Sequence, residues 1–228
     1  NPHKMGKWSK DSKTDIATMS GEDFCSNEKS ATITDAMAGN GKIEFVGADG
    51  SNTVLKEKIP LEVDDVVDAT KMSAKALREF MKKAKAEAKN RGVLLSLHMK
   101  ATMMKVSDPI IFGHGVTVVF EEVFEKHAET FKKLGVNANN GLGDVYSKIK
   151  SLPADQQKEI EGDIQSCIAN GPDLAMVDSD KGITNFHVPS DIIIDASLAA
   201  AIRTSGQMWG PDGKAYDTLA MVPDSSYA

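Results

Sequence analysis

The chain has 228 residues, of which 41% are hydrophobic and 26% are charged, and its formal net charge is −6. This is the composition of an ordinary globular protein, and the mild acidity argues against a nucleic-acid-binding protein, which would need clustered excess lysine and arginine. No apolar run approaches the roughly 18 residues of a membrane-spanning helix, so the pattern also argues against a membrane protein.

The first third of the chain predicts loop, a hairpin and one long helix. Residues 1 to about 30 are polar and mostly loop, with a short strand near 31–33. Strands over 42–46 and 53–59 flank an Asp-Gly turn, which is a strong hairpin signal. Ser73 then caps a helix of some eighteen residues that ends at Gly92, with apolar residues at helical spacing and a solvated lysine-rich face.

The middle of the chain predicts a buried strand followed by helices. The strand covers 93–99 and delivers Lys100. From Asp108 to Phe131 the apolar residues recur at helical spacing, interrupted at Gly113 and Gly115, and their valine and phenylalanine stripe is typical of a core face. A loop over 137–143 leads to further helices over about 142–150 and 154–169, the second closed by Gly171-Pro172.

The last stretch predicts a short strand at 174–177, a polar turn at 178–182, a helix from an N-cap at Ser190 to about Thr204, and a strand near 219–222. This mixture of helices and strands indicates an α/β fold with a mixed sheet and flanking helices. The two cysteines, Cys25 and Cys167, lie far apart and outside any metal-binding spacing. They favour a reduced, cytoplasmic protein.

One lysine and a pair of aspartates are candidates for chemistry. Lys100 follows an apolar run, and a lysine at the edge of a core can serve as acid, base or carboxylate clamp, although strand-end lysines are more often simply solvated. Asp191 and Asp195 lie four residues apart, on one face of the predicted helix. They could offer oxygen ligands to Mg²⁺ or Mn²⁺, or could simply favour the helix N-terminus.

Four segments resemble the monomeric, NADP-dependent isocitrate dehydrogenases of bacteria: LSLHMKATMMKVSDPIIFGHG, NNGLGDVYSKI, DSDKGITNFHVPSDIIIDAS and MWGPDGKAYDT. The resemblance covers essentially the whole chain. Members of that family are several times longer, so residues 1–228 are expected to be an internal segment of the large domain, with an isocitrate/isopropylmalate dehydrogenase-like fold. A sub-division into a hairpin-containing part, 1–92, and a helix-rich part, 93–228, is one expectation.

The resemblance implies a set of roles. Lys100 matches the catalytic lysine and would assist proton transfer, whereas Lys105 has the weaker claim. Asp195 matches a metal-binding aspartate, and Asp191 would support or cap it. A divalent cation, Mg²⁺ or Mn²⁺, would bind the hydroxyl and a carboxylate of isocitrate. Hydride would pass to NADP⁺ and carbon dioxide would leave. The NADP contacts and the remaining metal ligands are expected outside this chain.

His98, His114 and His187 show no ligand spacing, and each is more simply a hydrogen-bonded structural histidine. Lys181 and Asn185 could approach a carboxylate substrate, but no pattern requires it.

Because the NADP contacts and the remaining metal ligands are expected outside this chain, the isolated chain is expected to be inactive. The resemblance implies isocitrate as the substrate of the parent enzyme, and no nucleic-acid or membrane partner is expected. The alternatives are a non-catalytic folded module and one half of a split enzyme. Strands that lack their partners would invite self-association.

Overall fold

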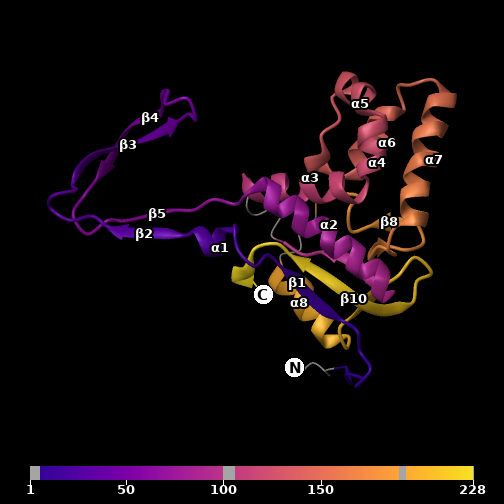
Figure 1. Cartoon of the computed structure of the whole chain (residues 1–228). Coiled ribbons are helices and arrows are strands. Elements are labelled where there is room, and N and C mark those ends of the chain that lie inside the picture. The colour runs from indigo at the N-terminus through magenta and orange to yellow at the C-terminus, as the bar shows by residue number, and fades with distance from the viewer. Residues whose placement is uncertain (1–5, 100–105, 190–193, 228) are drawn as a thin grey trace.

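A computed structural model describes residues 6–99, 106–189 and 194–227 (Figure 1). Its main sheet is built around β10 (Ala215–Val222), which pairs in parallel with β1 (Asp15–Thr18) and β6 (Leu94–Leu97) and antiparallel with β9 (Gln207–Trp209). All four residues of β6 and the last five of β10 are buried, as expected for parallel strands covered on both faces. The predicted α/β fold with a mixed sheet and flanking helices is therefore confirmed.

Helix α2 (Ala74–Arg91) packs on this sheet and begins and ends where the sequence predicts. The Ser73 hydroxyl accepts a hydrogen bond from the Ala76 amide, and Gly92 closes the helix in the left-handed conformation with φ 63°. Both caps satisfy helix-end groups that would otherwise lack partners. The face toward the sheet is apolar and consists of Leu77, Met81, Ala84 and Ala88, all buried.

The lysine-rich face of α2 is not simply solvated, which corrects the prediction for two of its residues. Lys85 Nζ donates to the Val119 carbonyl at 2.8 Å, and Arg78 donates to the Thr117 hydroxyl at 2.7 Å. Cations that bind the last carbonyls of a helix satisfy orphan acceptors and complement the helix dipole. These two side chains therefore fasten α2 to the C-terminal end of α3.

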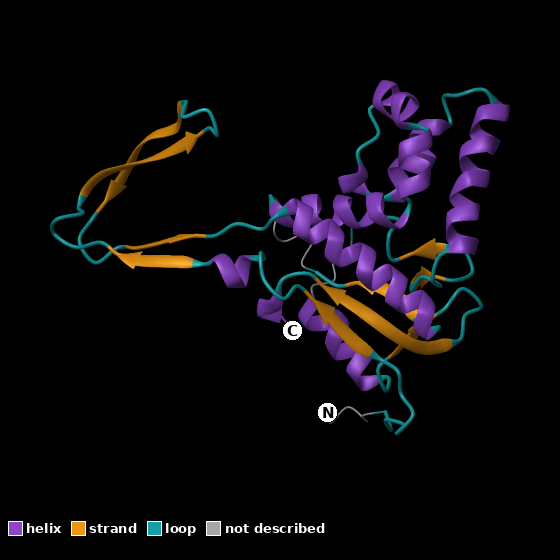
Figure 2. Ribbon diagram, in the orientation of Figure 1, coloured by secondary structure: helices purple, strands orange, loops and turns teal. Residues whose placement is uncertain are grey.

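The helices that follow form a second layer beside α2 (Figure 2). They are α3 (Ser107–Val119), α4 (Glu121–Lys126), α5 (Ala128–Leu134), the short 3₁₀ helix η1 (Ala138–Asn140), α6 (Leu142–Ile149) and α7 (Ala154–Asn170). The predicted interruption at Gly113 and Gly115 is wrong, because α3 runs through both glycines and the chain breaks instead at Phe120 and His127. The apolar stripe is a core face, as predicted: Phe112, Val116, Val119, Phe120, Val123 and Phe131 are buried.

Gly115 is a packing residue and not a helix breaker. A Cβ atom there would lie 2.9 Å from Leu97 Cδ2 in β6, with Phe186 and Met81 also within 4 Å. Glycine thus lets α3 approach the sheet where β6 ends. Gly113 serves the same purpose against Asn139 of η1.

A long β arm reaches away from the rest of the chain (Figures 1 and 2). It follows the short helix α1 (Phe24–Asn27) and consists of β2 (Lys29–Thr32) paired with β5 (Val66–Ala69), and of the hairpin β3 (Gly39–Val46) with β4 (Asn52–Leu61). The hairpin and its Asp-Gly turn are confirmed, with longer strands than predicted. Nearly every residue of these strands is exposed, including Phe45, Val46, Leu55 and Val66.

The remaining elements lie in the last quarter of the chain. The predicted strand at 174–177 is displaced to β7 (Met176–Asp178), which pairs with β8 (Ile183–Thr184), while Leu174 forms a single parallel bridge to Leu95. Helix α8 (Ile194–Arg203) is described from its second predicted turn, since Ser190 and Asp191 lie outside the described residues. The chain closes with η2 (Ser225–Tyr227). Among the described residues, no helix has both the length and the apolar character needed to cross a bilayer.

Candidate functional site

Two clefts flank the carboxyl end of β6. The α8 cleft, about 420 Å³, lies between the end of β6, helix α8 and β9, and includes Ser197, Ala200 and Trp209 in its lining. The α3 cleft, about 390 Å³, lies between the ends of β6 and β10 and the start of α3, and includes Ser107 and Asp108. His98 and Met99 line both clefts. Ligands of open α/β sheets bind outside the carboxyl ends of the strands, which is where these clefts lie.

His98 links the end of β6 to helix α8. Its Nδ1 lies 2.9 Å from the Ser197 hydroxyl and its Nε2 lies 2.7 Å from the Ser96 hydroxyl. The ring is buried, and this burial lowers the pKa of His98 to about 4, so the imidazole is neutral near pH 7. Because Ser197 donates its proton to the Ile194 carbonyl, Nδ1 is assigned as the donor to Ser197 and Nε2 as the acceptor from Ser96.

Of the predicted site residues, Asp195 lies within the described part of the chain. Lys100 and the weaker candidate Lys105 lie outside the described residues. Asp195 lies in the first turn of α8 and is exposed. The residues next to these candidates, Met99 and Ala196, line the same α8 cleft.

The other candidates have structural partners. His187 stacks on Tyr146, with ring centroids 5.7 Å apart, and its Nδ1 accepts a hydrogen bond from the Thr184 amide. The prediction that His98 and His187 are hydrogen-bonded is therefore confirmed. Lys181 forms an ion pair with Asp178 at 3.1 Å, and Asn185 Oδ1 accepts from the Leu97 amide while the residue lines the α8 cleft.

The electrostatics of the α8 cleft are set by few groups. Most of its lining is apolar, and the neutral His98 contributes no charge at pH 7. Sequence reasoning missed Ser197 and Trp209, because nothing in their local pattern sets them apart.

The donor set of Asp195 fits one part of a magnesium or manganese site. A carboxylate oxygen is the ligand type that these hard cations prefer. Within residues 6–99, 106–189 and 194–227, Asp195 does not converge with two further histidine, cysteine or carboxylate ligands. A complete coordination sphere at Asp195 would therefore need donors from beyond this set, such as substrate, water or other parts of a longer protein.

Known proteins resemble this chain along its whole length. The family model described as monomeric isocitrate dehydrogenase matches residues 1–228. The isocitrate dehydrogenase [NADP] 2 of Colwellia maris is 58% identical over 228 residues, and the isocitrate dehydrogenase [NADP] of Azotobacter vinelandii is 54% identical over the same length. Each match covers 100% of this chain but 30% of the relative, so the chain spans under a third of these curated relatives.

A solved isocitrate dehydrogenase from Ostreococcus tauri, in complex with isocitrate and magnesium(II), aligns with 85% of this chain and 34% of that chain. The TM-score is 0.42 and the sequence identity 11%, a likeness too distant to support any statement about the site. The family match and the two relatives carry the assignment instead. They run through the β arm, the end of β6 and α8 without leaving any part of the chain unmatched. This chain belongs to the monomeric isocitrate dehydrogenase family.

Proposed function

We propose that the chain supplies part of the active site of an NADP-dependent isocitrate dehydrogenase, which oxidises and decarboxylates isocitrate to 2-oxoglutarate, and that it is inactive alone. The observation that carries this proposal is the match along all 228 residues to relatives named isocitrate dehydrogenase [NADP], at 58% and 54% identity. The reduced cysteines predicted from sequence fit a cytoplasmic enzyme.

Asp195 and Lys100 are the residues proposed to act. Asp195, at the start of α8, would contribute a carboxylate oxygen to Mg²⁺ or Mn²⁺. When bound, such a cation holds substrate oxygens and lowers the cost of negative charge on them. Lys100, two residues beyond His98, would donate or accept a proton near the reacting carbon and stabilise developing negative charge. The neutral His98, hydrogen-bonded through both ring nitrogens, would hold the end of β6 against helix α8.

The same features argue that the chain needs a larger whole. Transition-state stabilisation requires all members of a site at once, and losing members costs orders of magnitude in rate. Here the metal donors at Asp195 are incomplete within the described residues, and the NADP contacts are proposed to lie in the remaining 70% or so of a relative-length protein. The chain is accordingly proposed to be an internal segment of the large domain.

The β arm supports this view on independent grounds. An isolated two-stranded hairpin is marginally stable in water unless an apolar face is covered. In the β3–β4 hairpin of the arm, Phe45 is 58% exposed and Leu55 is 66% exposed. We propose that further sequence of a longer protein covers these side chains.

Both proposed sub-divisions contribute strands to the main sheet. Residues 1–92 contribute β1, and residues 93–228 contribute β6 and β10.

A chimera tests the proposal. Residues 1–228 would replace the matching stretch of the Azotobacter vinelandii relative, and NADPH formation from isocitrate and Mn²⁺ would be followed at 340 nm for the chimera and for the 228-residue chain alone. We expect turnover from the chimera and none above background from the chain. An inactive but folded chimera would favour the alternative of a non-catalytic module, and an active isolated chain would refute the incompleteness.

A further inference from the structure

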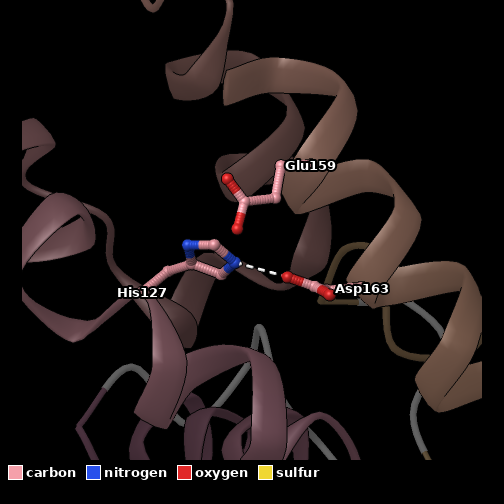
Figure 3. Close-up of side chains that lie close together, drawn as sticks. All are labelled: His127, Glu159 and Asp163. Atoms are coloured by element: carbon pink, nitrogen blue, oxygen red, sulfur yellow. Dashed lines mark hydrogen bonds and ion pairs between the residues drawn. The ribbon is translucent and has the colours of Figure 1, made fainter. Parts of the chain in front are cut away.

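A cluster of ionisable side chains lies between α4, α5 and α7 (Figures 1 and 3), and none of its residues lines the α3 cleft or the α8 cleft. It consists of His127, Glu159 and Asp163, whose ligand atoms all lie within 4.8 Å of one another. His127 Nε2 is 2.7 Å from Asp163 Oδ2. In Figure 3 the imidazole ring points at the two carboxylates of a single helix.

The backbone fixes the directions of these three groups. Glu159 and Asp163 are four residues apart on α7 and therefore share one face. His127 sits at the junction of α4 and α5, where its amide donates to the Val123 carbonyl and its carbonyl accepts from the Phe131 amide. Its ring is buried and lies 5.9 Å from the Phe131 ring, centroid to centroid. One rigid nitrogen thus faces two carboxylates across a helix–helix contact.

A fourth side chain competes for the same space. The Lys126 ammonium lies 2.7 Å from Asp163 Oδ2 and 3.0 Å from Glu159 Oε1. This ion pair first, and the hydrogen bond from His127 second, hold the pKa of Asp163 below its ordinary value, so that its carboxylate is ionised. Lys126 itself is 51% exposed in its side chain and can turn out into water. The point between the carboxylates is therefore a cation position, held by an ammonium in this arrangement.

We propose that His127, Glu159 and Asp163 form a binding site for a divalent transition-metal ion, with Zn²⁺ as the best fit, and that Lys126 is its built-in competitor. One imidazole nitrogen and two carboxylates form a ligand set that suits zinc, whereas magnesium and calcium prefer oxygen donors alone. Tetrahedral zinc with bonds of 2.0–2.2 Å needs ligand atoms about 3.3 Å apart. Rotation of the exposed Glu159 and a small opening of the His127–Asp163 pair reach that spacing.

The consequence of binding would be structural. The ion would join α7 to the α4–α5 junction, at a point that the α3 and α8 clefts do not include. A ligand that binds the folded state alone stabilises it by mass action. The apparent affinity is reduced by the fraction of time that Lys126 occupies the position, and removal of its charge should raise that affinity.

Zinc titration tests the proposal on the 228-residue chain after treatment with a chelator. Binding would be followed by competition with a chromophoric zinc indicator, and melting temperature would be measured with and without Zn²⁺, Mg²⁺ and Ca²⁺. We expect one equivalent of Zn²⁺ to bind and to raise the melting temperature, with no such effect of Mg²⁺ or Ca²⁺. Lys126→Met should tighten binding at least about tenfold, and Glu159→Gln should weaken it at least about tenfold.

Matched variants keep the result specific to this cluster. Glu161→Gln alters a carboxylate two residues from Glu159 on α7, and His114→Gln alters a histidine elsewhere; both should leave zinc affinity unchanged. His127→Gln should abolish the one-equivalent binding. The proposal is overturned if the folded chain binds no zinc, or if zinc binds equally well after Glu159→Gln, His127→Gln and Lys126→Met.

Discussion

His98 and Ser197 are 99 positions apart in the sequence, yet His98 Nδ1 lies 2.9 Å from Ser197 Oγ. This hydrogen bond joins the end of strand β6 to helix α8, which begins at Ile194 and carries Asp195 in its first turn. His98 precedes Lys100 by two positions, and Ser197 follows Asp195 by two positions. The geometry of the proposed site therefore depends on a small number of polar atoms at the end of β6.

Ser197→Ala should destabilise the chain by about 1–2 kcal/mol, because it leaves the buried His98 Nδ1 without its partner. Urea unfolding followed by circular dichroism would measure the change. Ser166→Ala is the matched control, since Ser166 is an exposed helical serine bonded to the Gly162 carbonyl, and should change stability by less than about 0.5 kcal/mol. Equal effects of the two substitutions would contradict the structural importance of the link.

The burial of His98 predicts a specific loss of stability in acid. Burial lowers the pKa of His98 from 6.5 to about 4. Between pH 4 and pH 6.5 the unfolded chain binds a proton at His98 that the folded chain does not bind. The contribution of the neutral His98 to the unfolding free energy is therefore complete above pH 6.5 and is lost as the pH falls toward 4. The loss in unfolding free energy should be about 3 kcal/mol.

The measurement is the unfolding free energy of the wild type and of His98→Gln at a series of pH values. The variant is expected to be less stable at pH 7 but to lose less stability on acidification. Carboxylates such as Asp23 also lose stabilising interactions in acid, so the difference between the two proteins is the informative quantity. Burial of Asp23 opposes ionisation, but hydrogen bonds from Ser225 and Ser26 hold its pKa well below the ordinary range. Parallel curves would show that His98 does not titrate as described.

Gly115→Ala should destabilise the chain by about 1–2 kcal/mol, because the added Cβ would lie 2.9 Å from Leu97 Cδ2 and the strain of displacing this buried side chain exceeds the helix-propensity gain of alanine. Gly162→Ala on α7 is the matched control, since a Cβ there meets nothing within 4 Å. That control should stabilise the chain by up to about 1 kcal/mol through helix propensity. Thermal or urea unfolding compares the two, and a neutral Gly115→Ala would contradict the close approach.

The β arm predicts self-association of the isolated chain. Exposed apolar strands with unpaired edges are templates for pairing with a second copy. Size-exclusion chromatography with light scattering should show dimers or larger species that dissociate in the Phe45→Lys, Leu55→Lys variant. Lys58→Ser, also on the exposed surface of β4, should leave association unchanged. A wild-type chain that stays monomeric at high concentration would refute this prediction.

The elements that could be predicted from the sequence are those whose ends are set by neighbouring residues. Helix α2 was predicted to the residue because its caps, Ser73 and Gly92, are encoded next to it, and the hairpin followed from Asp49-Gly50. Strand β1 was missed, since its partner β10 lies about 200 positions away and its four residues carry no apolar alternation. Gly115 was misread because glycine serves both as a breaker and as a site of close packing.

The site was predictable only in part, for the same physical reason. The candidate positions Lys100 and Asp195 came from a family resemblance, and the family is confirmed, but their roles stay predictions. The contact between His98 and Ser197 is set by tertiary packing of distant segments, which no spacing in the sequence reveals. The cluster at His127 offered a partial signal in Glu159 and Asp163, whose spacing puts two carboxylates on one helical face.

The central claim is that Lys100 takes part in the chemistry of isocitrate oxidation, next to a metal-binding Asp195. The most direct measurement is turnover of Lys100→Met in the chimera with the Azotobacter vinelandii relative, compared with Lys105→Met as the matched control. We predict a loss of about 1,000-fold or more in kcat for Lys100→Met with an unchanged melting temperature, and near-normal turnover for Lys105→Met. Near-normal turnover of a folded Lys100→Met chimera would contradict the account.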